Sequence, residues 1–194
     1  MDPERGAGRA KFVFDLASPQ AYLAAERVNH VLGEVPEWVP IRTEVGPFRC
    51  AEEVAAYRED VERAARAQGV QPLRWPEPFP ADTEWAMLAA TYAKQIGRAV
   101  AFSLAAFRQA FAAGRDLGER DTVLLAAAAC EMHPAAVIKG AELRSTRERL
   151  EAASAEAAAA GVRDVPAVVT AAGDVIEVPP AAGSPGKGFG VSPA

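Results

Sequence analysis

The feature that most constrains this chain is a short apolar run that leads through Ser-Pro directly into a helical pattern. Residues 12–16 form the aromatic-rich run that a buried strand requires. Ser18 then suits a helix N-cap, and Pro19 suits the first helical position, where the N–H would be unpaired in any case. An apolar helical stripe follows, formed by Tyr22, Leu23, Val28 and Val31. The stretch therefore predicts strand, tight turn and helix, with a hydroxyl at the helix end that favours an anion or a thiolate.

A second strand and a long helical region come next. Residues 37–42 complete a βαβ unit, for which parallel strands and a right-handed crossover are the default. Pro40 cannot donate to a ladder, so this strand is at an edge or short. Helical spacing runs from 51 to 68 and again from 82 to 161, and the proline-rich segment 73–80 between them predicts a packed loop.

The chain then returns to strands. Residues 166–170 and 175–178 flank Gly173-Asp174, which is a hairpin signal. The order predicts an α/β fold, a thioredoxin-like sheet (βαβ…ββ) with an inserted helical domain. We expect the thioredoxin-like domain at 11–45 and 141–178, the inserted domain at 50–140, and flexible termini at 1–10 and 179–194, the latter poorly ordered or laid over the surface.

Composition excludes several classes of function. The net charge of -5 gives no electrostatic reason to expect nucleic acid. The first ten residues are polar, which argues against a secretory signal, and no apolar run approaches the roughly 20 residues of a membrane span. Cys50 and Cys130 form no C-x-x-C and are expected to be reduced thiols of a cytoplasmic protein, although a bridge between them stays open. His30 and His133 lack neighbours at ligand spacing, so we expect no metal.

Three motifs, read together, resemble one branch of the thioredoxin superfamily. The first is the opening Phe-Val-Phe-Asp-Leu-Ala-Ser-Pro-Gln-Ala-Tyr-Leu at 12–23. The second runs from 60–65, which includes Arg63-Ala64, through Gly69-Val70 to Phe79-Pro80-Ala81-Asp82-Thr83. The third runs from Glu156-Ala157 through Gly161-Val162-Arg163-Asp164-Val165-Pro166 to Val169. In this order and spacing they resemble the DsbA-like branch, most closely 2-hydroxychromene-2-carboxylate isomerases and kappa-class glutathione transferases.

The resemblance implies a thiol site. Ser18 would occupy the place of the first cysteine of a C-x-x-C centre and hydrogen-bond the sulfur of glutathione or another low-molecular-weight thiol. Pro166 would be a cis-proline that leaves the backbone of Val165 free to pair with the glutathione peptide. Trp75, with Phe79 and Tyr92, could wall a pocket for a small aromatic or otherwise electrophilic acid. Without cysteine at Ser18 or Ala21, dithiol–disulfide exchange cannot run here.

The chain also departs from the resemblance. Asp82 replaces an Asn, which adds a negative charge near an anionic ligand, and Asp164 replaces a Gly. After Val178 a Pro-Pro-Ala-Ala-Gly run stands where the resemblance implies a ligand-pairing carboxylate and a closing helix. Loss of that helix would expose apolar sheet, so the resemblance and this loss together predict a homodimer.

Alternatives stay open at several positions. Ser18 is either a plain cap or the thiol contact. Asp15 is a turn partner or a general base, and Tyr22 and Trp75 either pack or contact ligand. The whole chain is accordingly either a thiol-dependent isomerase or transferase, or a non-catalytic DsbA-like binding or assembly protein with a degenerate thiol site.

Overall fold

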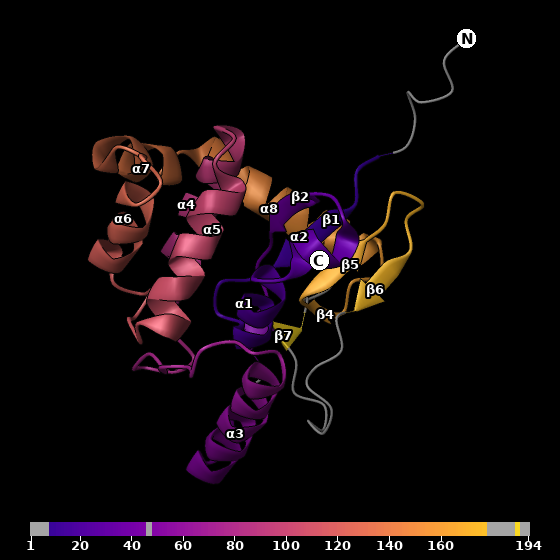
Figure 1. Cartoon of the computed structure of the whole chain (residues 1–194). Coiled ribbons are helices and arrows are strands. Elements are labelled where there is room, and N and C mark those ends of the chain that lie inside the picture. Colours follow the sequence, from indigo (N-terminus) through magenta and orange to yellow (C-terminus); the bar gives the residue numbers. More distant parts are fainter. Residues whose placement is uncertain (1–7, 46–47, 178–188, 191–194) are drawn as a thin grey trace.

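A four-stranded mixed sheet forms the centre of this computed structural model, which describes residues 8–45, 48–177 and 189–190. The strand order is β2-β1-β5-β6 (Figure 1). Strand β1 pairs with β2 in parallel and with β5 antiparallel, and β5 and β6 form the predicted hairpin. The strands are β1 (Lys11–Phe14), β2 (Glu37–Pro40), β5 (Ala167–Val169) and β6 (Val175–Glu177). The thioredoxin-like α/β plan is thereby confirmed, and Pro40 lies on a short edge strand.

The two faces of the sheet follow from the alternation of side chains along β1 and β2. Phe12 and Phe14 share one face with Trp38, because Phe12 is the register partner of Trp38. All three are at most 2% exposed, and the Phe12 and Trp38 rings meet edge to face at 4.9 Å. Phe14 extends this contact to Phe107 of the neighbouring helix at 5.7 Å. The aromatic run predicted as a strand is thus the centre of the hydrophobic core.

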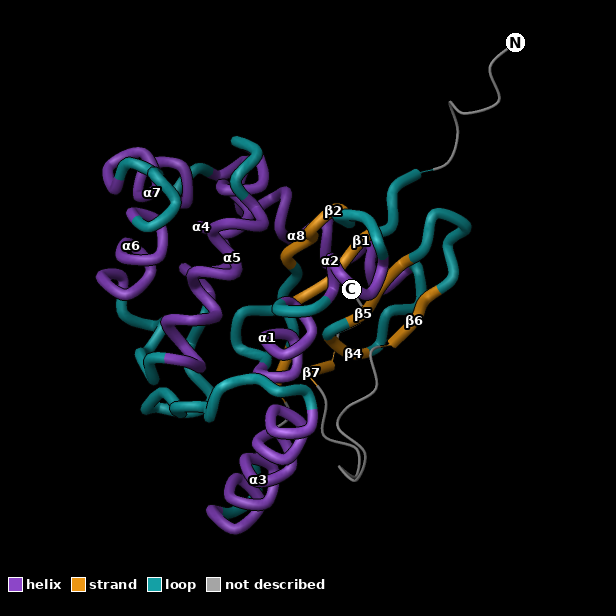
Figure 2. The backbone as a smooth tube through the Cα atoms, viewed as in Figure 1, coloured by secondary structure: helices purple, strands orange, loops and turns teal. Residues whose placement is uncertain are grey.

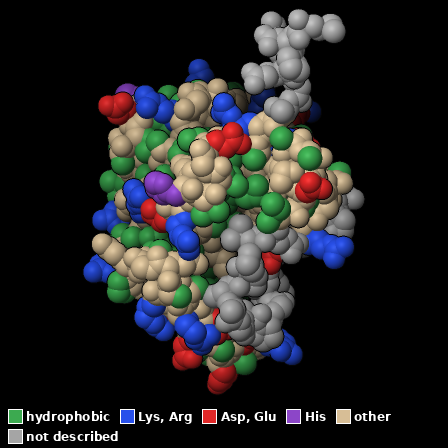
Figure 3. Space-filling view, turned by 45° about the vertical axis from the view of Figure 1, so that its right-hand side comes forward, with side chains coloured by type: hydrophobic (Ala, Val, Ile, Leu, Met, Phe, Trp, Pro, Cys, Tyr) green, Lys and Arg blue, Asp and Glu red, His purple; other side chains and the backbone are tan. Residues whose placement is uncertain are grey.

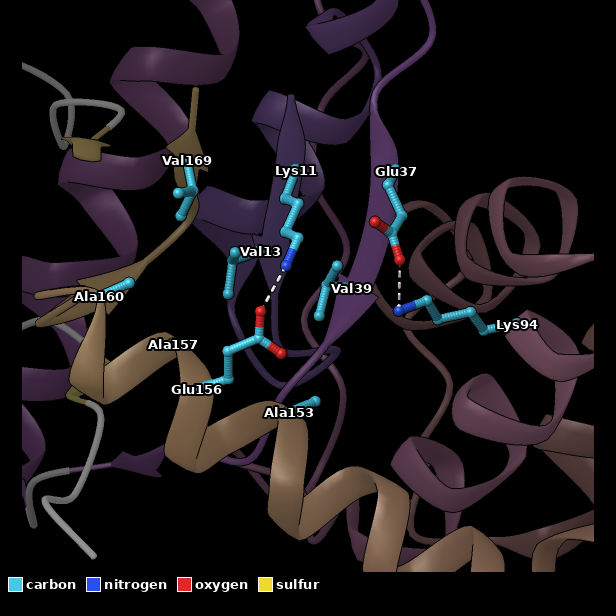
Figure 4. A pocket seen from close by; sticks show the side chains of 10 residues that line it. All are labelled: Lys11, Val13, Glu37, Val39, Lys94, Ala153, Glu156, Ala157, Ala160 and Val169. Atoms are coloured by element: carbon cyan, nitrogen blue, oxygen red, sulfur yellow. Dashed lines mark hydrogen bonds and ion pairs between the residues drawn. The ribbon is translucent and has the colours of Figure 1, made fainter. Parts of the chain in front are cut away.

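The opposite face carries valines and two ion pairs. Val13, Val39 and Val169 line a cavity of about 90 Å³ between the sheet and α8 (Arg144–Ala159). Figure 4 shows Lys11 reaching Glu156 across this cavity, at 2.5 Å, and Lys94 reaching Glu37 at 2.8 Å. Lys11 and Lys94 are therefore each paired with a glutamate. The cavity lies on the sheet face opposite Phe12 and Phe14.

Helices fill the middle of the chain. In Figure 1 a group of four, α4–α7, stands beside the sheet, and we call it the helical block. Its members are α4 (Glu84–Gln95), α5 (Ala99–Phe107), α6 (Arg120–Ala128) and α7 (Pro134–Ala141), and a π-helical turn, η1 (Arg108–Ala112), extends α5. The predicted helical spacing over 82–161 is confirmed, with left-handed Gly97 and Gly114 following two of the helices.

One predicted helix is broken. The stripe from Tyr22 to Val31 was expected to lie on a single helix, but the chain forms α1 (Pro19–Ala25) and a separate α2 (Val28–Leu32). Val31 is 70% exposed and so does not belong to a buried stripe. The break falls at Glu26, whose carboxylate is held by two hydrogen bonds from Arg108 of η1, at 2.7 and 2.8 Å. This contact comes from a residue far along the chain, and local spacing did not reveal it.

Helix α3 (Ala51–Ala67) and the loop after it form an arm. Figure 2 shows α3 extending away from the main sheet, with the long loop that follows it running back to the helical block. Tyr57 packs its ring against Phe48 at 5.5 Å and against Phe79 of that loop at 6.1 Å. The proline-rich segment 73–80 is therefore the packed loop that its prolines and aromatics predicted.

A second, three-stranded sheet was not predicted. Its order is β3-β7-β4, built from β3 (Glu44–Val45), β7 (Phe189–Gly190) and β4 (Asp164–Val165), with β7 antiparallel to both neighbours. The expectations for 1–7 and for most of the tail fall outside the described residues, but Phe189 and Gly190 are held in a strand. Among the described residues, no helix follows β6.

Candidate functional site

Asp15 organises the turn between β1 and α1. Its Oδ1 accepts hydrogen bonds from the Ala17 N–H at 2.9 Å and from the Thr83 hydroxyl at 3.3 Å. Its Oδ2 accepts from both the N–H and the hydroxyl of Thr43, at 2.9 and 2.7 Å. Burial is the main reason that the pKa of Asp15 is raised, against the lowering effect of these donors. The turn-partner interpretation of Asp15 is confirmed, and through Thr83 the first two sequence motifs meet at this carboxyl.

Ser18 caps α1 from a fully buried position. The Ser18 Oγ accepts a hydrogen bond from the Ala21 N–H at 3.1 Å, and the residue is 0% exposed. Its hydroxyl donates to Gln20 Oε1 over 3.4 Å, which is long for an O–H donor. The predicted cap is confirmed. The helix it caps has only seven residues, so the positive end of its dipole is smaller than the sequence suggested.

Ser18 and Pro166 lie at the same end of neighbouring strands. The antiparallel register pairs Val13 with Ala167, so the chain leaves β1 toward Ser18 where it enters β5 from Pro166. The peptide bond between Val165 and Pro166 is cis, as the resemblance implies. The cap and the cis-proline, which are far apart in the sequence, are thus brought to one edge of the sheet.

Strand β4, which ends just before this proline, is not a free edge. Val165 pairs with Phe189 of β7, and Asp164 pairs with Gly190. The backbone that the resemblance left open for the peptide of a thiol ligand is therefore occupied by this chain's own tail. Sequence reasoning missed this strand because a single phenylalanine between two glycines, Gly188 and Gly190, carries no recognisable strand pattern.

Gln20 and Tyr57 connect the Ser18 turn to β4. The Tyr57 hydroxyl donates to Gln20 Oε1, the same oxygen that faces the Ser18 hydroxyl. Burial raises the pKa of Tyr57, and the negative charge of Asp164 raises it further, while the hydrogen bond to Gln20 acts in the opposite direction. Neither Gln20 nor Tyr57 was singled out from the sequence. The only sequence signal was their position: Gln20 is the second residue of a capped helix, and Tyr57 lies on the apolar stripe of α3.

The aromatic residues predicted to wall a pocket fall into separate contacts. The Trp75 Nε1–H donates to Glu62 at 2.8 Å, and the Trp75 ring meets Phe79 at 4.9 Å. Arg58 of α3 lies over both rings, at 5.2 and 5.3 Å from their centroids. Trp75 thus joins the arm to its loop. Tyr92 lies instead against Gly140 of α7, and Tyr22, 4% exposed, packs on Phe111 in the core.

Asp82 lies beside the Ser18 turn at the junction of two cavities. A hollow of about 130 Å³ is lined by Asp82 together with Asp15, Ala17, Arg42, Thr43, Ala81, Thr83, Glu84 and Met87. A second hollow of about 290 Å³ shares Asp82 and Glu84 and adds Arg120 and Arg147. The Asp82 carboxylate accepts from the Glu84 N–H at 3.0 Å and so starts α4. The nearer hollow holds three acidic side chains against one arginine, so it does not favour a second anion.

Four further features of the described residues concern cysteines, metal-binding groups, membrane spans and surface charge. Cys50 is exposed and Cys130 is buried, and both are free thiols, so no dithiol pair occupies the turn. Among the residues that the structure describes, no group of three or more His, Cys, Asp or Glu is arranged to hold a metal ion. No helix in the described part of the chain is both long and apolar enough to cross a membrane. Figure 3 shows acidic and basic side chains interspersed over the face in view.

The fold is that of a thioredoxin-like α/β protein, in which Ser18 caps the helix that follows the first strand. The family model of the DSBA-like thioredoxin domain matches residues 10–184, and the chain belongs to that family. No curated protein matches the sequence at a significant level.

Solved structures share the fold at low sequence identity. A 2-hydroxychromene-2-carboxylate isomerase superposes with a TM-score of 0.75 at 19% identity, covering 87% of each chain. A putative protein disulfide isomerase from Nitrosomonas europaea gives 0.72 at 17%, over 89% of each chain. A probable DsbA oxidoreductase from Streptomyces coelicolor gives 0.69 at 20%, over 95% of this chain and 84% of that one.

Proposed function

We propose that this chain binds a low-molecular-weight thiol, such as glutathione, and uses it as a thiol-dependent isomerase or transferase acting on a small aromatic or otherwise electrophilic acid. The observation that carries this proposal is that the buried Ser18 and Pro166 lie at the same end of two adjacent strands, β1 and β5. The likeness in fold to a 2-hydroxychromene-2-carboxylate isomerase supports the same class of reaction.

The role of each residue follows from its hydrogen bonds. Ser18 would hold the sulfur, because its hydroxyl proton has only a long contact to Gln20 and can turn to a stronger acceptor. Val165 would hold the peptide of the thiol by its backbone. When bound, the thiol supplies a nucleophilic sulfur that adds to an electrophilic carbon and leaves again, so isomerisation needs no oxidant or reductant. The Ser18 hydroxyl is fully buried in this structure, and the Val165 backbone is blocked while β7 is paired there, so both must become accessible before the thiol binds.

Calorimetric titration of glutathione tests the role of Ser18. Saturable binding is expected, and Ser18→Ala should weaken it at least about tenfold, the equivalent of 1.4 kcal/mol. The variant also removes a helix cap, which costs about 1 kcal/mol of stability. His133→Ala is the matched control, because His133 caps α7 from the same position before a proline. Binding that Ser18→Ala leaves unchanged would contradict the proposal.

A second candidate is a non-catalytic DsbA-like binding or assembly protein. It is favoured by the complete burial of Ser18 and by the pairing of Val165 with the chain's own tail. Both candidates predict a blank disulfide-reductase assay. Measurable turnover in that assay would contradict our interpretation of the Ser18 turn.

A further inference from the structure

Strand β7 is the middle strand of its sheet, and this position is the starting point of the inference. Phe189 and Gly190 pair on one side with Val165 and Asp164, and on the other with Val45 and Glu44. If β7 left, β3 and β4 would both present unpaired N–H and C=O groups toward the space between them. Such a pair of edges accepts an extended peptide by main-chain hydrogen bonds. The slot between β3 and β4 is therefore built for one extended strand, and the tail fills it.

The same slot borders the proposed thiol site. Strand β4 ends at Val165, directly before cis-Pro166, and the Asp164 charge acts on Tyr57, whose hydroxyl reaches the oxygen facing Ser18. Any ligand that pairs with the backbone of Val165 must therefore compete with Phe189 of the tail, which pairs with the same backbone. They cannot be bound together.

The tail is tethered to the sheet it competes for. Strand β6 ends at Glu177, and residues 178–188, which connect it to β7, contain Pro179, Pro180 and Pro185 and several glycines. A short tether gives its end an effective concentration on the order of millimolar, so two paired residues can hold a site that a free peptide of that length would not.

We propose that β7 is an in-cis inhibitory strand: Phe189–Gly190 occupies the Val165 edge, and the tail must leave before a thiol or an extended peptide can bind. For the thiol this rests on the proposed function, whereas for an extended peptide it does not. The apparent dissociation constant of any such ligand is its intrinsic dissociation constant divided by the fraction of molecules in which the slot is open.

The first experiment releases the tail by substitution in the full-length protein. Phe189→Pro with Gly190→Pro removes both backbone N–H donors of β7. The control introduces two prolines elsewhere in the tail, by Ala181→Pro and Ala182→Pro. The probes are glutathione and a labelled synthetic peptide copying residues 185–194. The β7 variant is expected to bind the peptide at least about tenfold more tightly than the wild type and the control do.

The outcomes separate this inference from the proposed function. If only the β7 variant binds both the peptide and glutathione more tightly, the inhibitory strand and the thiol-dependent function are both supported. Peptide binding by the variant with no glutathione binding supports the inhibitory strand and contradicts the thiol-dependent function. Two outcomes would overturn the proposal of an inhibitory strand. In one, glutathione binds equally well to the wild type, the β7 variant and the control. In the other, the folded β7 variant does not bind the peptide.

A cross-link gives a second test, whose first readout, formation of the disulfide, needs no ligand. Asp164 and Gly190 are register partners. In a Cys50→Ser background, the substitutions Asp164→Cys and Gly190→Cys should therefore allow an intramolecular disulfide on mild oxidation, which mass spectrometry detects. The oxidised protein should lose peptide binding, and reduction should restore the level of the uncross-linked protein. Failure of this disulfide to form would overturn the inference, even if the proline variant does not fold.

Discussion

At the scale of single residues, Asp15 shows how one buried carboxyl joins distant parts of this chain. It receives hydrogen bonds from the turn after β1, from Thr43 after β2 and from Thr83 before α4. These donors are two backbone N–H groups and two hydroxyls, so an amide in the same place would leave donors facing its NH₂ group. Asp15 therefore orients the Ser18 turn without contacting the proposed ligand itself.

The raised pKa of Asp15 predicts a pH dependence of stability. The folded state keeps this proton to a higher pH than the unfolded chain does, so the folded state binds more protons between the two pKa values. The contribution of Asp15 to the free energy of unfolding is therefore most favourable below the unfolded pKa and is lost as the pH rises through the folded pKa. Each unit of difference between the two values corresponds to about 1.4 kcal/mol.

Urea denaturation of wild type and Asp15→Asn across about pH 4 to 8 measures this contribution. The wild type should lose stability relative to the Asn variant as the pH rises over the lower part of that range. Asp174→Asn, in the exposed hairpin turn, is the control and should run parallel to the wild type. If the wild type instead becomes more stable relative to Asp15→Asn as the pH rises, the hydrogen bonds lower the pKa of Asp15 more than burial raises it.

At the scale of elements, α4 is the helix that ties the helical block together. It packs against α5, α7, α8 and β2, and its contact with α7 depends on one glycine. A Cβ placed on Gly140 would lie 2.3 Å from Cδ2 of Tyr92, which is far inside van der Waals contact. Gly140 is therefore required by the close approach of two helices.

Gly140→Ala should accordingly destabilise the protein by about 1–3 kcal/mol through overpacking. Helix propensity alone would predict the opposite, a gain of about 1 kcal/mol. Thermal or urea unfolding distinguishes the two. Adding Tyr92→Ala removes the obstructing ring, so the double variant should lose less stability than the two single losses added together. A stabilised Gly140→Ala protein would contradict the packing argument.

At the scale of the whole molecule, the sheet ends without a covering helix among the described residues. Ile176, on the edge strand β6, is 53% exposed, and it lies on the same face as Val168 and Phe12, its neighbours across the ladder. Val31 and Val35, which follow α1 in the chain, are 70% and 50% exposed. Exposed apolar side chains on an open sheet edge favour association with another copy.

Self-association is therefore expected, with a dimer as the main species in sedimentation velocity at micromolar concentration. Ile176→Lys should shift the protein toward monomer, because a charge on the edge strand opposes edge-to-edge contact. Leu125→Lys is the control, since Leu125 is similarly exposed, at 48%, but lies on α6 in the helical block. A monomeric wild type would contradict this prediction.

Local patterns were enough to predict much of the architecture. The aromatic alternation of Phe12 and Phe14 predicted the central strand, Ser18-Pro19 predicted the cap of α1, and Gly173-Asp174 predicted the hairpin. Each of these depends on neighbours within a few residues, where backbone geometry and side-chain spacing dominate. The three motifs together also indicated the family, because their order reflects the order of the elements.

Other features depend on residues that meet only in the folded chain. The break between α1 and α2 coincides with Arg108 holding Glu26, the Asp15 carboxyl is closed by Thr43 and Thr83, and Val165 is paired by Phe189. In each case the partner lies far away in the sequence, and its contribution is a hydrogen bond or a ladder contact with no local signature. The sequence by itself determined that a Ser-Pro turn joins the first strand to the first helix and caps that helix. Only the tertiary structure decided that this serine is buried and that the chain's own tail closes the edge beside it, because burial and strand pairing are set by what packs against a residue.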